Sequence, residues 1–409
     1  MDQRTSELED RIRRALRDPR HELPAWPDPM RRVRQSARHQ RARLVLVTAV
    51  FAAASALIVL VTAGWLQATV RRPQHVTAGL VCPPAAAGAP RPAIGSSSAE
   101  IGTSLVRPGA LAVGPRGQVY VADDGLNQIL QVLPGGQFEV IAGNGRRGYS
   151  GDGGPAIAAA LNVPGGMTAT RGGTIYFADT GNNRVRAIWL SGTITTVAGT
   201  GQFGTWTAGG SAARHTSLGS PAAVAISPGG CLYIADEGNS EILRLGRSGR
   251  LARVAGIRGV AGVTGIGRPA ADASADGPDG LAFDRAGDLY IAGRNTKQLL
   301  MITAGGRMRL PIGRTGFYPH GMGGLAAGPA GVIAMNGQRV QEITHRGLRT
   351  LLDFTRDHPA GIRGFLPNGI AVGPDGVIYL DTYAGNGYTA KTALIEVRPG
   401  GQVRVLWQS

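Results

Sequence analysis

The sequence predicts an all-β protein, a six-bladed β-propeller, C-terminal to a single transmembrane helix. Three observations lead to this prediction. A sequence motif occurs in six copies after residue 100, and each copy consists of short apolar runs separated by turns that contain Gly, Asn and Asp. In addition, residues 44–66 form one long apolar stretch without a charge. The copies predict the blades, and the apolar stretch predicts the helix.

The copies begin at six prolines, of which the first four are 56 or 57 residues apart: Pro108, Pro164, Pro221, Pro278, Pro319 and Pro367. In the second copy, RGG, DTGNN and SG separate four apolar runs at about 166–170, 174–178, 184–189 and 193–198. Alternating runs of this size between turn signals predict an antiparallel meander. One such sheet cannot bury its faces alone, whereas six stacked around a ring can.

The second run of the first three copies ends in an aspartate: Asp123, Asp179 and Asp236. We expect these side chains to accept hydrogen bonds from turn amides, which is ordinary chemistry for Asp before Gly-Asn. A ring of metal ligands is the alternative. The last strand, near 402–407, belongs to the sixth copy, so ring closure requires no N-terminal strand unless a segment near 100–106 pairs elsewhere.

The motifs P-x-G, [VIL]-Y-[VIF]-A-D, G-N-[NS] and V-A-G resemble those of the NHL-repeat family of six-bladed β-propellers. The resemblance covers residues 100–409. It is strong in copies one to three and weaker in the fourth, where Gly293 replaces the aspartate. It implies a bacterial, membrane-anchored propeller, and the chain shows no kinase motif. The resemblance therefore implies that the propeller binds a ligand or another protein, as a sensor or scaffold.

Residues 44–66 are long enough for a helix that crosses the ~30 Å hydrocarbon core of a bilayer. Arginines, among them Arg38, Arg41 and Arg43, flank the near side, and Trp65 stands at the far end. The positive-inside rule then predicts a single-pass protein of the cell membrane, with a cytoplasmic N-terminus and an extracellular propeller. A cleaved signal peptide is the alternative, although its n-region and apolar core would both be unusually long.

The predicted domains are therefore four. Residues 1–43 are a cytoplasmic Arg-rich segment with a short amphipathic helix at 6–18, and residues 44–66 are the transmembrane helix. Residues 67–99, rich in Pro, Ala, Gly and Ser, form a tether, and residues 100–409 form the propeller. The two cysteines, Cys82 and Cys231, lack the spacing of a metal site. The sequence does not decide whether they form a disulfide bond.

The net charge of +16 does not indicate nucleic-acid binding. From residue 100 onward the chain has 28 basic and 20 acidic residues, spread without a basic run between aromatics. We therefore expect no nucleic-acid partner.

Three Gly-rich loops, at 144–163, 202–220 and 257–277, follow the first three blades. The first contains SGDGGPA, which resembles a phrase common in bacterial NHL proteins, and a short helical turn is expected at 156–161. Such loops form either a binding surface or structural linkers. For a binding surface that takes a protein, peptide or cell-wall ligand without a cofactor, the candidate contacts are Arg146, Arg147, Tyr149, Asp152 and Trp206.

An alternative function comes from the residue after each starting proline: Gly109, Gly165, Ala222, Asp279, His320 and Asn368. PDGL and PNGI resemble motifs of gluconolactonase-type six-bladed propellers, which implies one divalent metal such as Ca²⁺ or Zn²⁺ at Asp279, His320 and Asn368. The chain departs from that pattern in its first blade, where PGAL offers no acid. The alternative is thus a metal-dependent lactonase- or lyase-like enzyme, and otherwise these side chains cap turns.

Overall fold

The structure is a computed structural model that describes residues 101–102, 104–204, 212–258, 260, 262–275, 277–295, 298–312, 324–357, 365–384 and 391–409. The predicted cytoplasmic segment (1–43), membrane helix (44–66) and tether (67–99) lie outside these residues. So do Trp206 and His320. In the ranges that are described, no helix is long and apolar enough to cross a membrane.

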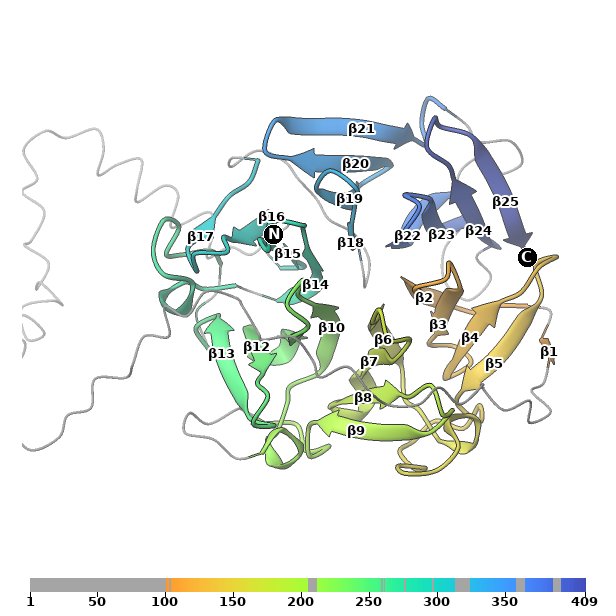
Figure 1. Cartoon of the computed structure of the whole chain (residues 1–409), viewed down its shortest axis with the longest axis horizontal. Helices are drawn as coiled ribbons and strands as arrows, with labels where there is room; N and C mark the ends of the chain where they lie inside the picture. The colour runs from red at the N-terminus through yellow and green to blue at the C-terminus, as the bar shows by residue number, and fades with distance from the viewer. Residues whose placement is uncertain are drawn as a thin grey trace, which may run out of the picture. The chain divides into compact units, whose positions relative to one another are not determined.

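Six antiparallel sheets surround a centre, and each is one blade (Figure 1). The strands of each blade follow one another in the chain from the centre outward. Blade 1 contains β2 (Pro108–Val113), β3 (Val119–Asp123), β4 (Gln128–Val132) and β5 (Phe138–Ala142); blade 2 contains β6 (Pro164–Ala169), β7 (Ile175–Asp179), β8 (Arg184–Ile188) and β9 (Ile194–Ala198).

The remaining four blades have the same order. Blade 3 contains β10 (Pro221–Ile226), β11 (Leu232–Asp236), β12 (Glu241–Leu245) and β13 (Leu251–Ala255); blade 4 contains β14 (Pro278–Phe283), β15 (Leu289–Gly293), β16 (Gln298–Ile302) and β17 (Met308–Arg309). Blade 5 contains β18 (Leu325–Ala327), β19 (Val332–Asn336), β20 (Arg339–Thr344) and β21 (Gly347–Asp353); blade 6 contains β22 (Leu366–Val372), β23 (Ile378–Ala384), β24 (Lys391–Val397) and β25 (Val403–Gln408). The predicted six-bladed propeller is confirmed.

The apolar faces of the blades pack against one another and form the core. Tyr233 of blade 3 meets Phe283 of blade 4 edge to face, with ring centroids 4.9 Å apart. Phe138 of blade 1 and Trp407 of blade 6 are arranged in the same way at 5.5 Å. Because both faces of a blade are covered by its neighbours, alternate residues of a strand can be apolar in both directions.

The ring closes without any exchange of strands, as the sequence indicated. β25 completes blade 6, and the Nδ2 of Asn368 donates a hydrogen bond to the carbonyl of Pro108 in blade 1 at 3.0 Å. The segment before blade 1 does pair, but at the periphery, where β1 (Ile101–Gly102) lies antiparallel to the outer edge of β5. β1 therefore protects a sheet edge and does not close the ring.

The three Gly-rich loops protect the outer edges of blades 2, 3 and 4 in a similar way. Each loop runs back beside the fourth strand of the following blade, and the pairs are Pro155 with Thr193, Ala212 with Arg250, and Pro269 with Arg307. Each loop then makes a short 3₁₀ turn: η1 (Ala156–Ala158), η3 (Ala213–His215) and η5 (Ala270–Asp272). An unpaired strand edge invites aggregation, so these loops have a structural role.

The turn between the second and third strands explains the G-N-[NS] motif. In blades 2 and 3 the turn contains η2 (Thr180–Asn182) and η4 (Glu237–Asn239), and it ends on Asn183 (φ 50°) or Ser240 (φ 55°) in the left-handed region. Asparagine tolerates this conformation better than most residues. The Oδ1 of Asn183 also accepts a hydrogen bond from the amide of Ser220, just before β10, at 2.9 Å. The motif thus links one blade to the next.

The ring has two different ends. At one end the first strands begin and the second strands finish, as the pairing of Pro108 with Asp123 shows, and the Gly-rich loops connect there; we call it the loop end. The other end carries the turns between first and second strands, such as 114–118 and 227–231, and we call it the turn end. Asp279 and Asn368 lie at the loop end. The loop 144–163 starts and finishes there, but its middle pairs with Thr193, in the turn between β8 and β9.

Candidate functional site

The strand-ending aspartates bind backbone amides, as predicted. The carboxylate of Asp123 accepts hydrogen bonds from the amides of Gly125 and Leu126 in the turn, and from those of Val106 and Arg107 before β2, at 2.7–3.1 Å. Asp179 and Asp236 accept the corresponding loop amides of Asn162 at 2.8 Å and Gly219 at 2.7 Å. Their further partners are the side chains of Asn182 and Asn239. These aspartates fasten the incoming loop to the turn.

Burial dominates the acidity of these groups. It raises the pKa of Asp179 to about 6 and that of Asp236 to about 7, and the hydrogen bonds only partly offset it. Within the ranges that the structure describes, no three His, Cys, Asp or Glu side chains gather in a way that could hold a metal ion. The hydrogen bonds therefore indicate a structural role for these aspartates, which hold backbone segments in place.

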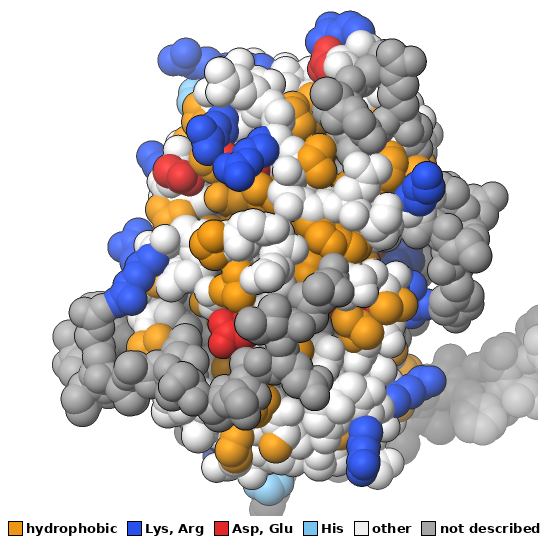
Figure 2. All heavy atoms as spheres, turned by 90° about the vertical axis from the view of Figure 1, so that its right-hand side faces the viewer, with side chains coloured by type: hydrophobic (Ala, Val, Ile, Leu, Met, Phe, Trp, Pro, Cys, Tyr) orange, Lys and Arg blue, Asp and Glu red, His pale blue; other side chains and the backbone are white. Residues whose placement is uncertain are grey.

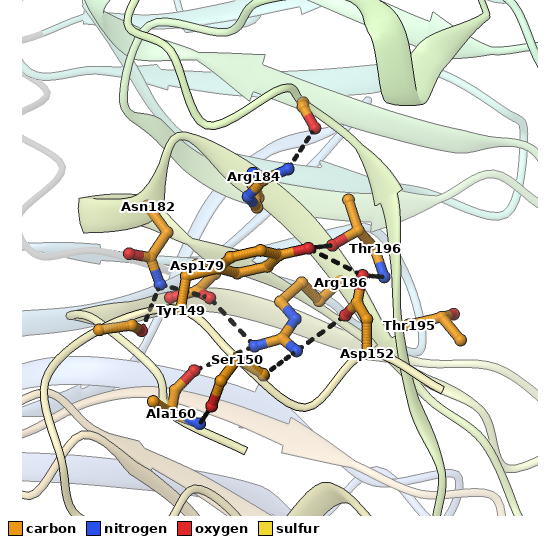
Figure 3. A network of polar contacts seen from close by, with 12 residues as sticks. Tyr149, Ser150, Asp152, Ala160, Asp179, Asn182, Arg184, Arg186, Thr195 and Thr196 are labelled. Carbon is orange, nitrogen blue, oxygen red and sulfur yellow. Dashed lines mark hydrogen bonds and ion pairs between the residues drawn. The ribbon is translucent and has the colours of Figure 1, made fainter. Parts of the chain in front are cut away.

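The loop 144–163 is held by one buried arginine of blade 2 (Figure 3). The side chain of Arg186 is fully buried. Its Nη2 donates to the carbonyl of Ser150 and to Oδ1 of Asp152, each at 2.8 Å. Its Nη1 donates to the carbonyl of Ala160 at 3.1 Å and lies 3.5 Å from Oδ2 of Asp179. Arg186 thus joins both halves of the loop to the blade.

Two of the predicted contact residues are part of this network. The hydroxyl of Tyr149 donates to Oδ2 of Asp152 at 2.9 Å, and the same oxygen accepts the amide of Thr196 at 2.9 Å. The guanidinium of Arg184 lies 3.8 Å from the centre of the Tyr149 ring, which is a cation–π contact. Burial raises the pKa of Asp152, but the hydrogen bonds from Thr196 and Arg186 outweigh it and lower the pKa below its usual value. Tyr149 nevertheless stays 42% exposed.

The two predicted arginines lie at the exposed part of the same loop. The Nε of Arg147 donates to Oδ1 of Asn162 at 2.8 Å. The guanidinium of Arg146 has no hydrogen-bond partner among the residues that the structure describes, while its amide donates to Oδ1 of Asn144 at 3.0 Å. The structure therefore brings Tyr149 and Asp152 into one network and leaves the two arginines beside it in solvent.

The candidates predicted from the sequence did not include Arg184, Arg186 and Thr196. A signal for Arg186 exists in the repeats themselves. In blades 1, 3 and 4 the same register position, opposite the middle of the second strand, is a leucine: Leu130, Leu243 and Leu300. Only in blade 2 of these four does a cation occupy this apolar position, opposite Phe177.

Asp279, the first predicted metal ligand, is buried where β14 begins. Its Oδ2 lies 3.4 Å from Nε of Arg294, whose Nη1 lies 2.9 Å from Oε1 of Glu237 in blade 3. Its Oδ1 is buried without a hydrogen-bond partner, and burial raises the pKa of Asp279 to about 7. The guanidinium beside Oδ2 opposes a divalent cation at that oxygen, whereas the unpartnered Oδ1 has no such competitor among the described residues.

Asn368, another predicted ligand, lies between blades 6 and 1. Its Nδ2 donates to the carbonyl of Pro108 and to Oδ2 of Asp381, each at 3.0 Å. Asp381 is enclosed, and burial raises its pKa well above the usual value. Because His320 lies outside the described residues, the metal set of Asp279, His320 and Asn368 stays a prediction.

We expect Asp279→Asn to flatten the pH dependence of stability. The folded-state pKa of about 7 exceeds the ordinary 3.8, so the folded protein keeps a proton that the unfolded chain releases between these values. The carboxyl therefore destabilises the fold increasingly as pH rises through this window, and fully above pH 7. Relative to the natural protein, the variant should gain on the order of 2–4 kcal/mol between pH 5 and pH 8.

Denaturant unfolding at the two pH values measures this difference, with Asp375→Asn at an exposed turn as the control. An unchanged pH slope in Asp279→Asn would show that the buried carboxyl does not titrate in this range.

One face of the ring carries its basic side chains in scattered groups (Figure 2). Figure 2 shows the side of the ring on which blades 1 and 6 lie. Its basic side chains stand in separate small groups, some beside acidic ones, and form no continuous basic patch there.

Comparison with known proteins gives one family match and several distant structural similarities. The family model of the teneurin NHL domain matches residues 55–189. No curated protein matches the sequence. Among solved structures, a virginiamycin B lyase from Staphylococcus aureus is 12% identical, with 73% of this chain and 84% of that chain covered and a TM-score of 0.44. A gluconolactonase from Xanthomonas campestris is 13% identical, with 71% and 86% covered and a TM-score of 0.47. A streptogramin B lyase is 15% identical, with 67% and 90% covered and a TM-score of 0.43.

At these scores and identities the likenesses give no information on activity. The family is established by other observations: the six sequence copies, the amide-binding aspartates at the strand ends, the six four-stranded blades and the match to an NHL model. The chain is an NHL-repeat six-bladed β-propeller.

Proposed function

We propose that this propeller is a membrane-anchored, extracytoplasmic binding module, a sensor or scaffold that takes its ligand at the loop 144–163. The observation that carries the proposal is the Arg186 network. It holds the loop against blade 2 and leaves Arg146, Arg147 and one side of Tyr149 available to a partner.

A linker that only connected two blades would not need this network. Burying a guanidinium has a high desolvation cost, which must be offset by well-placed acceptors. The positions equivalent to Arg186 are leucines in blades 1, 3 and 4. The loop that follows blade 3 pairs with the edge of blade 4, where Leu300 stands at the position of the arginine. A loop held in one conformation loses little entropy when it binds, which increases affinity.

The exposed groups favour an anionic partner with an apolar part. Arg146 and Arg147 can donate to carboxylate or phosphate oxygens, and the Tyr149 ring offers an apolar face at low entropic cost. A protein or peptide with acidic side chains, or an anionic cell-wall polymer, has this chemistry. The uncharged stretch 44–66 with its arginine flank supports the proposed location.

Charge reversal at the loop tests this proposal. Cells expressing the full chain would carry a photocrosslinking amino acid at Ala158, which is exposed in the same loop, and the adducts would be identified by mass spectrometry. The double variant Arg146→Glu/Arg147→Glu is expected to reduce the adduct about tenfold, because opposite charges at the contact become like charges. Arg171→Glu, an exposed arginine of the turn end, is the matched control and should leave the adduct intact. Equal adduct yields from all three proteins would disprove binding at this loop.

A second candidate, the metal-dependent lactonase- or lyase-like enzyme, has one observation in its favour. The buried Oδ1 of Asp279 lacks a hydrogen-bond partner, and an unpaired buried oxygen is a common feature of ligand sites. Elemental mass spectrometry of the purified protein, beside the double variant Asp279→Ala/Asn368→Ala, decides between the candidates. A stoichiometric divalent metal that the variant lacks would favour the enzyme, whereas a metal-free natural protein would remove this candidate.

A further inference from the structure

We infer that the outer edge of blade 5, formed by β21, binds an extended segment of another protein that carries acidic side chains. β21 lies at the rim of the ring, and its outward backbone groups would pair with that segment as with an added strand (Figure 1). This edge belongs to a different blade from the one that holds the loop 144–163, so the inference does not depend on the function proposed above.

The fourth strands of the six blades share one position, the residue that pairs with the third strand just beyond the hairpin turn. It is apolar in every blade: Phe138, Ile194, Leu251, Met308, Leu348 and Val403. In blades 1–4 the residue is at most 4% exposed, whereas Leu348 of blade 5 is 43% exposed. The position is thus buried in four blades and open in blade 5.

An extended segment covers this position in blades 1–4. In blade 2 the amide of Ile194 donates to the carbonyl of Gly154 at 3.0 Å, and its carbonyl accepts the amide of Gly153 at 2.7 Å. In blade 4 the amide and carbonyl of Met308 bind the loop 257–277 in the same way, at 3.0 Å and 2.8 Å. β1 and the second Gly-rich loop cover blades 1 and 3. The repeat is therefore built to hold an extended segment at this edge.

The backbone groups of Leu348 are available for such a segment. Thr344 pairs with Gly347 across the turn, and Leu348 then pairs with Ile343 as Ile194 pairs with its partner in blade 2, so its amide and carbonyl point outward. Among the residues that the structure describes, none outside the hairpin bonds to them. Residues 310–324 connect blade 4 with blade 5, a shorter connection than those that cover blades 2–4.

The charges beside this edge favour an acidic partner. His345 and Arg346 of the turn are exposed, and the side chain of Arg349 is 68% exposed although its Nη2 donates to the buried carboxylate of Glu342 at 2.7 Å. Residues 344–350 include no acid. Carboxylates on an incoming strand therefore meet guanidinium groups and no like charge. A second copy of β21 would instead bring arginine beside arginine, which opposes self-pairing.

The edge of blade 6 is less open than that of blade 5. Val403 and Val405 of β25 pack on the core cluster of blades 5 and 6. The carbonyl of Leu406 lies so close to Gly136 of blade 1 that a side chain would not fit there. In β21, by contrast, all residues from Gly347 to Thr350 are exposed. Blade 5 is therefore the blade at which we place the added strand.

Short fluorescent peptides test the inference on the purified full chain in detergent micelles. The first peptide alternates Glu and Val, the second alternates Lys and Val, and the third repeats the first with methylated backbone amides. The Glu/Val peptide is expected to bind about tenfold more tightly than either of the others, because it alone offers both carboxylates and strand hydrogen bonds. Equal binding of all three, or binding of none, would overturn the inference.

Leu348→Pro locates the site. Proline removes the outward amide but is tolerated on an edge strand whose N–H faces solvent, so the blade should stay folded. The variant is expected to bind the Glu/Val peptide at least about tenfold more weakly. Val403→Pro, at the same position of blade 6, is the matched control and should bind it as the natural chain does. Unchanged binding by Leu348→Pro would show that the peptide does not pair with β21.

Charge reversal gives a result that unfolding cannot produce. Arg346→Glu, at an exposed position of the turn, is expected to weaken binding of the Glu/Val peptide and to strengthen binding of the Lys/Val peptide. Arg146→Glu/Arg147→Glu should change neither. If only this loop variant loses the Glu/Val peptide, the peptide binds at the loop 144–163 and the assignment to blade 5 is wrong.

Sedimentation of the chain without peptide tests the remaining occupant, a second copy. We expect Leu348→Pro to sediment as the natural chain does. A dimer of the natural chain that Leu348→Pro dissociates would show that β21 pairs with itself, which contradicts an acidic partner strand.

Discussion

Replacing Arg186 with alanine is expected to lower the free energy of unfolding by about 3–5 kcal/mol, because it leaves buried acceptors without their cation. Asp179 would lose its only counter-ion that the structure describes, and the carbonyls of Ser150 and Ala160 would lose their donors. Denaturant unfolding measures the total effect. Hydrogen exchange of residues 148–161 should also accelerate, because the loop is no longer held to blade 2.

The matched control for this change is Arg186→Leu, which introduces the residue of blades 3 and 4 at the same position. Leucine fills most of the volume but cannot bind Asp152 or Asp179, so we expect an intermediate loss. In both variants the pKa of Asp179 should rise above its present value of about 6. The loss of stability should therefore be larger at pH 8 than at pH 5, since protonation removes the buried charge. A loss below about 1 kcal/mol in the alanine variant would mean that the network does not hold the loop.

Replacing Asp123 with alanine is expected to cost about 3 kcal/mol or more, because four amides lose their acceptor. Two of these amides, of Gly125 and Leu126, belong to the turn, and the other two, of Val106 and Arg107, precede β2. The change should therefore loosen the entry into blade 1 as well as the turn. Thermal unfolding and limited proteolysis near residues 104–126 measure both effects.

Two further variants make this prediction specific. Asp123→Asn keeps one acceptor oxygen and should lose only part of the stability. Asp124→Ala removes the neighbouring carboxylate, which pairs with the half-exposed side chain of Arg107, and should cost about 0–1 kcal/mol. If Asp123→Ala costs no more than Asp124→Ala, the aspartate of the repeat has no special structural role.

The strands could be predicted closely because their signals are local. In the second copy the predicted runs at 166–170, 174–178, 184–189 and 193–198 correspond to β6–β9, with ends that differ by at most two residues. Alternation of apolar residues and the turn chemistry of Asp-x-Gly-Asn are contained in a few consecutive residues. The number of blades followed from counting the copies.

The contacts of the loops could not be predicted in the same way. Arg186 is 34 residues from Asp152 and 36 from Ser150 in the chain, and the pairing of Pro155 with Thr193 is just as distant. Nothing in the local sequence of SGDGGPA indicates which strand edge it will cover. The same holds for β1, which pairs with β5 at the outer edge of blade 1.

The candidate metal residues show this difference most clearly. Asp279 and Asn368 occupy the same position of the repeat and look equivalent in sequence. In the folded chain their partners differ, since Arg294 pairs with the one and Asp381 with the other. Those partners come from different parts of the repeat, so only folding determines the chemistry at each position.

The sequence by itself determined the architecture: six copies with strand-length apolar periodicity have to pack as six blades, since no single copy can bury its faces. Only the tertiary structure decided what the loops do. It placed a buried cation beneath loop 144–163. The physical reason is that periodicity is a short-range property, whereas the hydrogen bonds of Arg186 depend on which distant segments the closed ring brings together.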